Sequence, residues 1–391
     1  MTETADQVQR RELVERVRAL APLIAQNAER AEQERKPVDE VISALEETGV
    51  FKSYVPKRFG GFEIDADTFI DIGLAVSKAC TSTGWVTTFY MEHNWMLAQF
   101  PEKTQTKLFG AQPYVLAPGS ISPTGQAQRK DDGYVLSGRW AWGTGVMHAD
   151  WVLLNGIIEG DVPDIRLFLV PRDQIRVEDT WDCAGMAGTG SNDMIAEDVF
   201  VSAAYSESLL NMSVGRGSGS ASHDSPCYRH PMLPLLGIAA AIPALGAAQR
   251  SVELFKERLG TRTLYGTFSK QAERASAQMR LAHATVRVES AETLLRHVGQ
   301  SLAVWGASDE VCPPEERARL RLQTAQIVEM CRDIVRNVME ASGASAHLRP
   351  HPMQRIHRDI HTLSCHTVFD LDIGAENYGR LLLGFDPITP V

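Results

Sequence analysis

Residues 133–142 read Gly133-Tyr-Val-Leu-Ser-Gly-Arg-Trp-Ala-Trp142, a run rich in β-branched and aromatic side chains that is typical of a strand. Two further runs of this kind follow, Trp151-Val-Leu-Leu154 and Ile165-Arg-Leu-Phe-Leu-Val170, and Gly, Pro and Asp residues separate them. Because turn-forming residues between short apolar runs indicate strands joined by turns, this part of the sequence predicts a β domain over 114–208.

The sequence before this β region has the apolar spacing of helices. Between Leu13 and Gly49 the apolar residues fall on one helical face, which predicts two helices, and the helical pattern resumes near Asp65. We therefore expect an N-terminal helical domain over 1–113.

Helical spacing returns in the last third of the chain, where it predicts long amphipathic helices packed as a four-helix bundle over 233–391. A Gly/Ser-rich stretch, 213–222, precedes them and predicts a flexible segment or lid at 209–232. The expected fold is therefore mainly α with a central β domain (α+β). It has an N-terminal helical domain, a middle β-barrel-like domain and a C-terminal helical bundle.

The composition is that of an ordinary globular protein and excludes several classes. The chain has 391 residues, 44% of them hydrophobic, and a formal net charge of -10, which repels phosphate backbones and argues against nucleic acid as a partner. Its six cysteines lack the Cys-x-x-Cys spacing of a metal site, so we expect no metal and reduced thiols in the cytoplasm. No apolar run approaches the ~18 residues of a membrane span, so we expect no membrane partner.

No short motif with a catalytic mechanism of its own is present, neither a phosphate loop nor a dinucleotide fingerprint. Longer segments instead resemble the acyl-CoA dehydrogenase fold. Within it they most resemble the oxygenase components of two-component, reduced-flavin-dependent aromatic hydroxylases, relatives of 4-hydroxyphenylacetate 3-hydroxylase and dibenzothiophene monooxygenase. Four segments carry this resemblance: Gly84-Trp85 through His93 to Phe100-Pro101, Ser120-Ile-Ser-Pro-Thr-Gly125, Ser137 through Trp151, and Gly185 through Asp193 with Asp198-Val-Phe-Val201.

A fifth segment, 352–367, distinguishes between branches of this fold. It resembles the dehydrogenases' C-terminal run ending in Tyr-Glu-Gly-Thr, but His366 and Thr367 stand where that Tyr and the catalytic Glu are found. Threonine cannot remove a carbon-bound proton at neutral pH, so thioester dehydrogenation is disfavoured. In the hydroxylases that the chain resembles, a His of this segment lies beside the flavin C4a-hydroperoxide, and the resemblance assigns that role to His366. The alternative is a structural histidine, since His357 and His361 are near it in the sequence.

The resemblance also implies flavin contacts from the β domain. Trp142 and Thr144 match a Trp-x-Thr/Ser segment whose hydroxyl contacts flavin N5 and whose ring flanks the isoalloxazine. Trp140, Trp142 and Thr144 also alternate as residues of any half-buried strand do, which is the alternative. A loop near the flavin in the hydroxylases corresponds here to Gly188, Thr189 and Ser191.

Substrate and dinucleotide contacts are implied in the same way. His93 and Ser120 lie in the regions with which phenol hydroxylases bind the phenolic oxygen, although His93 could be a core histidine. Ser122 could equally take the place of Ser120, and we count it among the flavin contacts. Arg262-Thr-Leu-Tyr-Gly266 resembles Arg-x-x-Phe-Gly, whose Arg meets the dinucleotide pyrophosphate of a neighbouring subunit. The alternative for Arg262 is a solvated arginine at a helix end.

The implied activity is that of an oxygenase component. It takes reduced FAD, or FMN, from a separate NAD(P)H-dependent flavin reductase, uses O2, and hydroxylates a phenol- or indole-type substrate. A homotetramer is implied as well. Three alternatives stay open: N- or S-oxygenation by the same fold, an acyl-CoA dehydrogenase-like enzyme with a displaced carboxylate such as Glu376, and a flavin-binding helical protein without chemistry.

Overall fold

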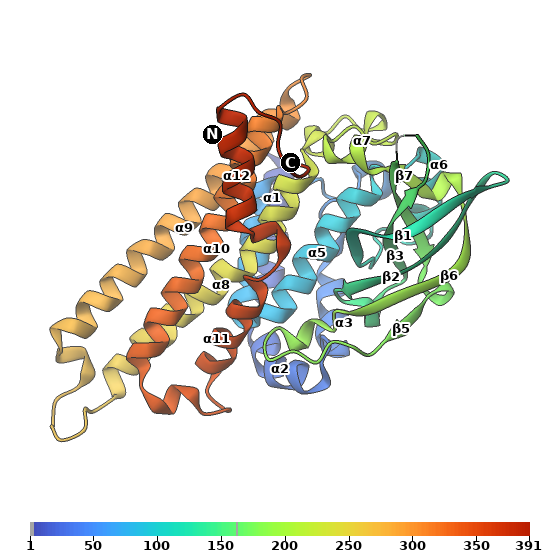
Figure 1. The fold of residues 1–391 in the computed structure, drawn as a ribbon. Helices are drawn as coiled ribbons and strands as arrows, with labels where there is room; N and C mark the ends of the chain where they lie inside the picture. Colours follow the sequence, from blue (N-terminus) through green and yellow to red (C-terminus); the bar gives the residue numbers. More distant parts are fainter. Residues whose placement is uncertain (1–3, 162) are drawn as a thin grey trace.

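The computed structural model describes residues 4–161 and 163–391. Helical regions precede and follow a β domain along the chain, and in space they lie together on one side of it (Figure 1). Three helices rather than two precede residue 50, because the chain breaks after Arg18 and Pro22 lies in the first turn of the next helix. The N-terminal helices are α1 (Ala5–Arg18), α2 (Ala21–Glu34), α3 (Asp39–Thr48), α4 (Ala66–Ala79), α5 (Thr81–Leu97) and α6 (Glu102–Ala111).

A 7-stranded sheet follows, with the strand order β5-β6-β2-β1-β3-β4-β7. Neighbouring strands are antiparallel except β1 and β3, which are parallel. Among the described residues β5 and β7 are the two edges, so the sheet stays open instead of closing into a complete barrel. The strands are β1 (Gly119–Lys130), β2 (Gly133–Gly143), β3 (Trp151–Ile158), β4 (Asp164–Pro171), β5 (Arg176–Glu178), β6 (Asn192–Ser202) and β7 (Ser206–Ser208).

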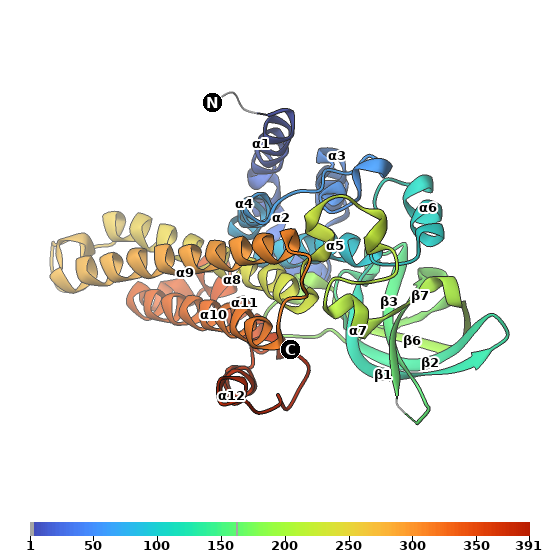
Figure 2. The same ribbon diagram turned by 90° about the horizontal axis from the view of Figure 1, so that it is seen from above.

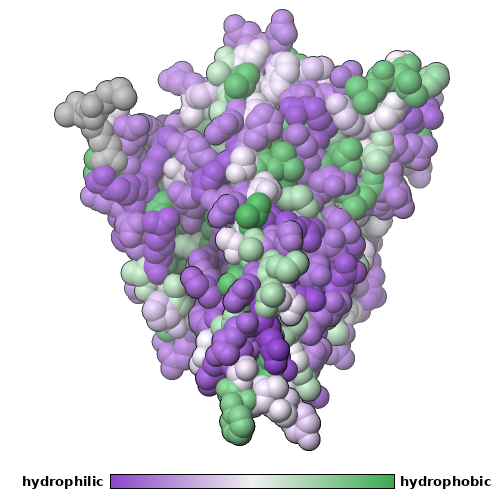
Figure 3. All heavy atoms as spheres, turned by 90° about the vertical axis from the view of Figure 1, so that its left-hand side faces the viewer, coloured by the Kyte–Doolittle hydropathy of each residue, from purple (hydrophilic) through white to green (hydrophobic). Residues whose placement is uncertain are grey.

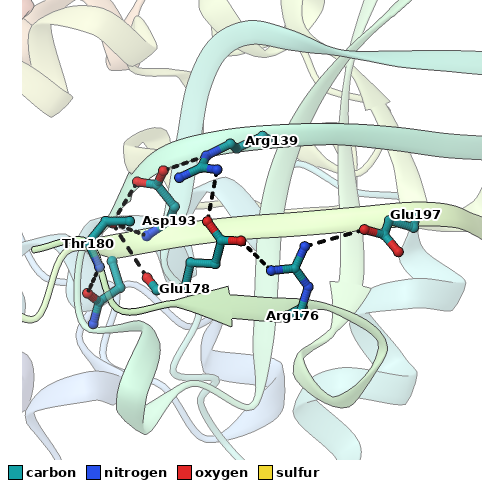
Figure 4. Close-up of polar contacts among 7 residues, drawn as sticks. Arg139, Arg176, Glu178, Thr180, Asp193 and Glu197 are labelled. Atoms are coloured by element: carbon teal, nitrogen blue, oxygen red, sulfur yellow. Dashed lines mark hydrogen bonds and ion pairs between the residues drawn. The ribbon is translucent and has the colours of Figure 1, made fainter.

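Ion pairs on the surface of the sheet link the edge strand β5 to β6 and β2 (Figure 4). Arg139 of β2 pairs with Glu178 of β5 at 2.8 Å and with Asp193 of β6 at 2.7 Å, and the network continues through Arg176. Exposed pairs of this kind stabilise a fold by only about 0–1 kcal/mol each. Their importance here is positional, because β5 leads directly into the loop that carries Trp181 to the functional site.

The C-terminal region contains three long helices that lie side by side, with two shorter helices against α10 (Figures 1 and 2). Both helical regions share one apolar core, whereas the β domain has a core of its own. The helices of this region are α8 (Met232–Thr261), α9 (Ala275–Ala307), α10 (Pro314–Ser342), α11 (Pro352–Leu363) and α12 (Leu371–Leu382).

Helix α8 corrects the expectation that no apolar run approaches the length of a membrane span. In the described part of the chain it is the one helix that passes this test by length and composition, with a mean hydropathy of 1.6 over its most apolar window. However, 89% of that window is buried inside the fold. The helix is apolar on all sides because α4, α5, α9 and α10 all pack against it.

The segment 209–232 has specific contacts that its Gly/Ser composition does not predict. The backbone N–H of Gly217 donates to Gln99 Oε1 at 3.1 Å, and that of Gly219 donates to the Gln99 carbonyl at 2.9 Å. A Cβ on Gly219 would lie 1.8 Å from the Phe100 carbonyl oxygen, so glycine is required there for close packing. Movement of this segment as a lid stays a prediction.

Candidate active site

A cavity of about 310 Å³ lies where α5, the sheet and the C-terminal helices meet. Aromatic and apolar side chains form much of its wall, and a few hydroxyls and two imidazoles supply polar atoms, which is typical of small-molecule sites. Eight of the predicted site residues line this cavity: His93, Ser120, Ser122, Trp142, Thr144, Thr189, Ser191 and His366.

Helix α5 supplies one wall. Trp85, Phe89, His93 and Met96 follow the spacing i, i+4, i+8 and i+11, so they share one face of the helix. Every residue of α5 is buried, so its other faces pack into the core. Helical spacing is the sequence signal that identifies Trp85, Phe89 and Met96, which the predicted site does not include.

His93 presents a free hydrogen-bond acceptor to the cavity. Its Nδ1 lies 2.6 Å from the Ala117 carbonyl oxygen, and because a carbonyl can only accept, Nδ1 carries the proton of the neutral ring. Burial lowers the pKa of His93 to about 4, so the ring is neutral at neutral pH. Gly119 leaves room beside Nε2, since a Cβ there would lie 3.3 Å from that atom. The lone pair of Nε2 can therefore accept a hydrogen bond from a ligand O–H or N–H.

Glu92 is a buried acid next to this imidazole. Its side chain is 0% exposed, and its Oε2 lies 3.7 Å from His93 Nε2. Neither carboxyl oxygen has a hydrogen-bond partner among the described residues. Burial raises the pKa of Glu92 well above its ordinary value, which favours the neutral carboxylic acid in the folded protein.

Glu92→Gln should raise the free energy of unfolding relative to the wild type, by an amount that grows with pH. Once the pH exceeds the ordinary pKa of 4.5, Glu92 must take up a proton when the protein folds. The free energy of unfolding of the wild type therefore falls by up to about 1.4 kcal/mol per pH unit until the pH reaches the raised pKa. Glutamine has no such proton to bind. Urea titrations at several pH values measure the difference, with Glu47→Gln, an exposed carboxyl on α3, as the control. A difference independent of pH would contradict the assignment.

Ser120 and Ser122 both reach the cavity from the start of β1. The register of β1 against β3 shifts between Ser120 and Gly125. Such an irregularity interrupts the strict alternation of side chains, and consecutive residues from Gly119 onward line the cavity. Ser120 and Ser122 therefore both stay candidates for contacting substrate or flavin.

Three hydroxyls form an ordered chain on the β-domain side. The Thr189 hydroxyl donates to the Met186 carbonyl at 2.9 Å, so Ser191 donates to Thr189 at 2.8 Å and Thr144 donates to Ser191 at 3.0 Å. Thr144 Oγ1 also accepts from the indole N–H of Trp85 at 3.3 Å. Contacts with described residues thus engage the proton and one lone pair of Thr144. Its second lone pair can accept from a ligand N–H.

Trp142 lies at the mouth of the cavity and is 61% exposed, whereas Trp140 is fully buried and its indole N–H donates to the Asn155 carbonyl at 2.7 Å. Strict strand alternation would place these two residues on the same face. The register of β2 against β6 shifts between Trp140 and Gly143, and this irregularity turns one indole into the β core and the other toward the site. Trp142 has φ +66°, a left-handed conformation that costs roughly 1–3 kcal/mol outside glycine and is concentrated at ligand sites. Its contact with flavin stays a prediction.

His366 reaches the cavity from the turn after α11. Its Nδ1 accepts from the Val368 N–H at 3.2 Å, which caps the short helix η11 (Thr367–Phe369) and leaves the proton of the neutral ring on Nε2. The ring contacts Trp85 edge-on, with centroids 5.5 Å apart. Burial, followed by the Arg321 charge, lowers the pKa of His366 to about 4. At neutral pH this side chain is therefore a neutral Nε2–H donor.

Gly188 lies outside the cavity wall, in the short helix η5 (Ala187–Thr189). A Cβ on Gly188 would lie 3.2 Å from atoms of both Ala31 and Ser82. Glycine at this position therefore allows η5 to pack against α2 and α5, and its flavin contact stays a prediction.

Asp359 of α11 fixes the start of the same loop and was not predicted. Its buried carboxyl accepts from the Met186 N–H at 2.6 Å, and burial raises its pKa to about 6. Trp181, also outside the predicted site, is held by its indole N–H, which donates to the Met186 carbonyl at 2.9 Å. Neither residue follows a periodic pattern in the sequence, because each joins segments that are distant along the chain.

Arg262 lies far from the cavity of its own chain. Its guanidinium donates to the Ala341 carbonyl at 3.2 Å and to Gln271 at 3.3 Å, beside Gly343. Leu236, a cavity residue, and Arg262 are 26 residues apart along α8, which at about 1.5 Å per residue separates them by roughly 39 Å. A contact of Arg262 with flavin would therefore need a second copy of the chain, and that contact stays a prediction.

The described residues that line the cavity include no Asp or Glu. Glu376, the carboxylate considered for a dehydrogenase, is exposed on α12 and outside the cavity. The described residues of the cavity wall therefore offer no carboxylate for the removal of a thioester α-proton.

The chain can now be placed among known proteins. The family described as acyl-CoA dehydrogenase, C-terminal domain, matches residues 238–371. The chain is 35% identical to the pigment production hydroxylase of Rhodococcus sp., over 98% of this chain and 99% of the relative. It is 32% identical to the oxygenase subunit HsaA, a flavin-dependent monooxygenase of Rhodococcus jostii, over 96% and 99% of the two chains.

Solved structures agree with this assignment. HsaA monooxygenase from M. tuberculosis has a TM-score of 0.91 and 28% identity, covering 97% of this chain and 99% of the other. XiaF from Streptomyces sp., in complex with FADH2 and glycerol, has a TM-score of 0.92 and 28% identity, covering 98% of each chain. The fold is that of the acyl-CoA dehydrogenases. Within it, the chain belongs to the family of flavin-dependent monooxygenase oxygenase components.

Proposed function

We propose that this chain hydroxylates a small aromatic compound as the oxygenase component of a two-component system. A separate NAD(P)H-dependent reductase supplies reduced FAD, or alternatively FMN, and O2 supplies the oxygen atom. Two relatives carry such activities in their names: the p-hydroxyphenylacetate 3-hydroxylase oxygenase component of Acinetobacter baumannii, 29% identical, and the FADH2-dependent resorcinol hydroxylase oxygenase component of Rhizobium sp., 30% identical.

The observation that carries this proposal is that two neutral imidazoles present opposite hydrogen-bonding atoms to one apolar cavity. His93 has a free acceptor at Nε2, because its Nδ1 is tied to Ala117. His366 has a donor at Nε2, because its Nδ1 is tied to Val368. An acceptor suits a phenol O–H or an indole N–H, and it favours these substrates over a thioether sulfur, which has no proton to donate. The Nε2–H of His366 can donate a hydrogen bond to an oxygen atom that O2 supplies.

The residues at the cavity mouth fit a flavin. Trp142 offers an exposed aromatic face, and Thr144 keeps a lone pair that can accept from a ring N–H. Ser191 and Thr189 hold the Thr144 hydroxyl in place through their hydrogen bonds. Bound reduced flavin supplies the activation of O2. The apolar α5 face, with Trp85 and Phe89, excludes water from the reacting atoms.

Rapid mixing tests the proposal directly. The protein is loaded anaerobically with photoreduced FAD and then mixed with oxygenated buffer while the flavin absorbance is followed. A flavin transient that free FADH2 does not show is expected, with a decay that a phenol or an indole changes. Reoxidation at the rate of free flavin, for both FAD and FMN, would contradict the proposal.

Thr144→Val should shorten the lifetime of that transient about tenfold. Valine has nearly the same shape but has no oxygen to accept from the flavin ring, and one hydrogen bond contributes about 1–1.5 kcal/mol. Thr144→Ser, which keeps the hydroxyl, is the matched control and should decay at close to the wild-type rate. Equal lifetimes for the valine and serine variants would show that Thr144 does not contact the flavin.

We also propose a homotetramer assembled through the C-terminal helices. The face in Figure 3 carries exposed apolar side chains among polar ones, and a partner copy could cover them. Assembly would also bring Arg262 to the flavin of another copy. Light scattering measures the mass in solution, and a monomer at micromolar concentration would contradict the proposal. The exposed apolar residues of α9 and of the hairpin before it are Tyr265, Phe268, Met279, Val286 and Val304.

We further propose that the protein works in the cytoplasm. All six cysteines are free thiols in the structure, and four of them, Cys80, Cys227, Cys312 and Cys331, are buried. Unpaired cysteines are typical of a reducing compartment. Fractionation of the producing cells tests this, and recovery of the protein from a secreted or membrane fraction would contradict it.

A further inference from the structure

The turn that carries His366 is held from outside the cavity by one buried cation. Arg321 of α10 is only 9% exposed. Its guanidinium donates to the carbonyl oxygens of Thr367 at 3.2 Å, Val368 at 3.4 Å and Pro390 at 3.5 Å. Among the described residues it has no carboxylate within ion-pair distance, so these backbone carbonyls are its direct partners, and the charge of Asp370 acts on it from farther away. A buried charge of this kind is costly and needs such partners.

The Thr367–Val368 peptide bond connects this cation to the imidazole. A trans peptide is planar, and its C=O and N–H point in opposite directions. Arg321 binds the Thr367 carbonyl oxygen on one side of this plane. The Val368 N–H on the other side donates to His366 Nδ1 at 3.2 Å. Fixing the carbonyl therefore fixes the N–H, and the N–H determines which ring nitrogen carries the proton.

We propose that Arg321 is a positioning residue that acts through the Thr367–Val368 peptide to hold His366 as the Nε2–H tautomer facing the cavity. The catalytic use of that tautomer rests on the proposed function, but the positioning itself does not. Lysine could not replace the guanidinium fork, because one ammonium cannot span three separate carbonyl oxygens in fixed directions. The contact with Pro390 joins the C-terminal tail to the same arrangement.

Both the charge of Arg321 and its hydrogen bonds favour the neutral ring of His366. The His366 ring faces Trp85 and Phe89 of α5 and Phe369 of η11, none of which titrates. Arg321 is the charged group that adds to burial in lowering the pKa of His366, while Cys365 and Asp370 are the titratable groups on its own segment. A cation beside the ring disfavours imidazolium and so keeps the neutral tautomer across the neutral pH range.

Hydrogen–deuterium exchange at the imidazole Cε1, read by mass spectrometry across pH, reports the pKa of each histidine in the flavin-free, full-length protein. In Arg321→Met the pKa of His366 should rise by at least about one pH unit, which is a tenfold change in its protonation constant. His357 and His361 are internal references. Arg319→Met is the matched control, because Arg319 lies on the same helix and forms an ion pair with Glu316 at 2.6 Å. An unchanged pKa of His366 in a folded Arg321→Met protein would overturn the proposal.

Arg321→Lys keeps the positive charge but loses the guanidinium, so it separates the effect of the charge from that of the hydrogen-bond geometry. The same variant tests the proposal if Arg321→Met does not fold. It should restore a low pKa of His366, yet the flavin transient should still decay faster than in the wild type because the fork is lost. Wild-type behaviour in both measurements would overturn the positioning role. Absence of any transient in the wild type would contradict the proposed function alone, since the exchange measurement does not depend on flavin.

Discussion

His366→Ala should lower the rate of hydroxylation by about 10²-fold or more, while flavin oxidation continues. A positioned acid or base contributes typically 10²–10⁴-fold. The Nδ1 of His366 accepts from the Val368 N–H, so its Nε2–H is left as a donor. The ring reaches the cavity beside Trp85. Without it, oxygen should be released as peroxide instead of entering the product. Product yield by chromatography and peroxide release, measured together, check this expectation.

His357→Ala is the matched control for this experiment. His357 lies on α11, outside the cavity, and contacts His361, with 3.2 Å between the two Nε2 atoms. Its removal should leave the rate of hydroxylation within about twofold of the wild type, since surface substitutions rarely matter by more than about 0.5 kcal/mol. If His366→Ala behaved like His357→Ala in both yield and peroxide release, the catalytic assignment of His366 would be wrong.

Trp140→Ala should destabilise the protein by about 3–5 kcal/mol. Trp140 is fully buried in the core of the β domain, and its indole N–H donates to the Asn155 carbonyl at 2.7 Å. Replacement leaves a cavity and an unpaired carbonyl. Urea unfolding followed by circular dichroism measures the loss, which does not depend on tryptophan fluorescence.

Trp142→Ala is the matched comparison, since Trp142 lies two residues later on the same strand. Its side chain is 61% exposed, so the free energy of unfolding should change by no more than about 0.5 kcal/mol. Its loss should instead weaken the binding of reduced FAD, measured anaerobically by fluorescence quenching. Similar destabilisation by both variants, with unchanged flavin affinity, would contradict the separate roles of the two indoles.

Much of the site could be predicted, because its residues belong to local patterns in the sequence. The α5 face with Trp85, Phe89 and His93 follows helical spacing. The replacement of the dehydrogenase carboxylate by His366 and Thr367 could be read from the sequence, and the cavity indeed has no Asp or Glu among its described residues.

Other features could not be predicted, because they depend on contacts between segments far apart in the sequence. Gly188 packs against Ala31, and Arg262 lies at the end of α8 remote from the cavity. Nothing local to Glu92 marks it as an unpaired buried acid, and nothing local to Arg321 links it to His366.

The sequence by itself determined the order of helical and β regions and the residue types available to the site, because hydrophobic periodicity is a local property of the chain. Only the tertiary structure decided the tautomers of His93 and His366. The partners that set them are the Ala117 carbonyl and the Val368 N–H. Every residue has a backbone carbonyl and every residue except proline has an N–H, so only folding selects which of them meet an imidazole.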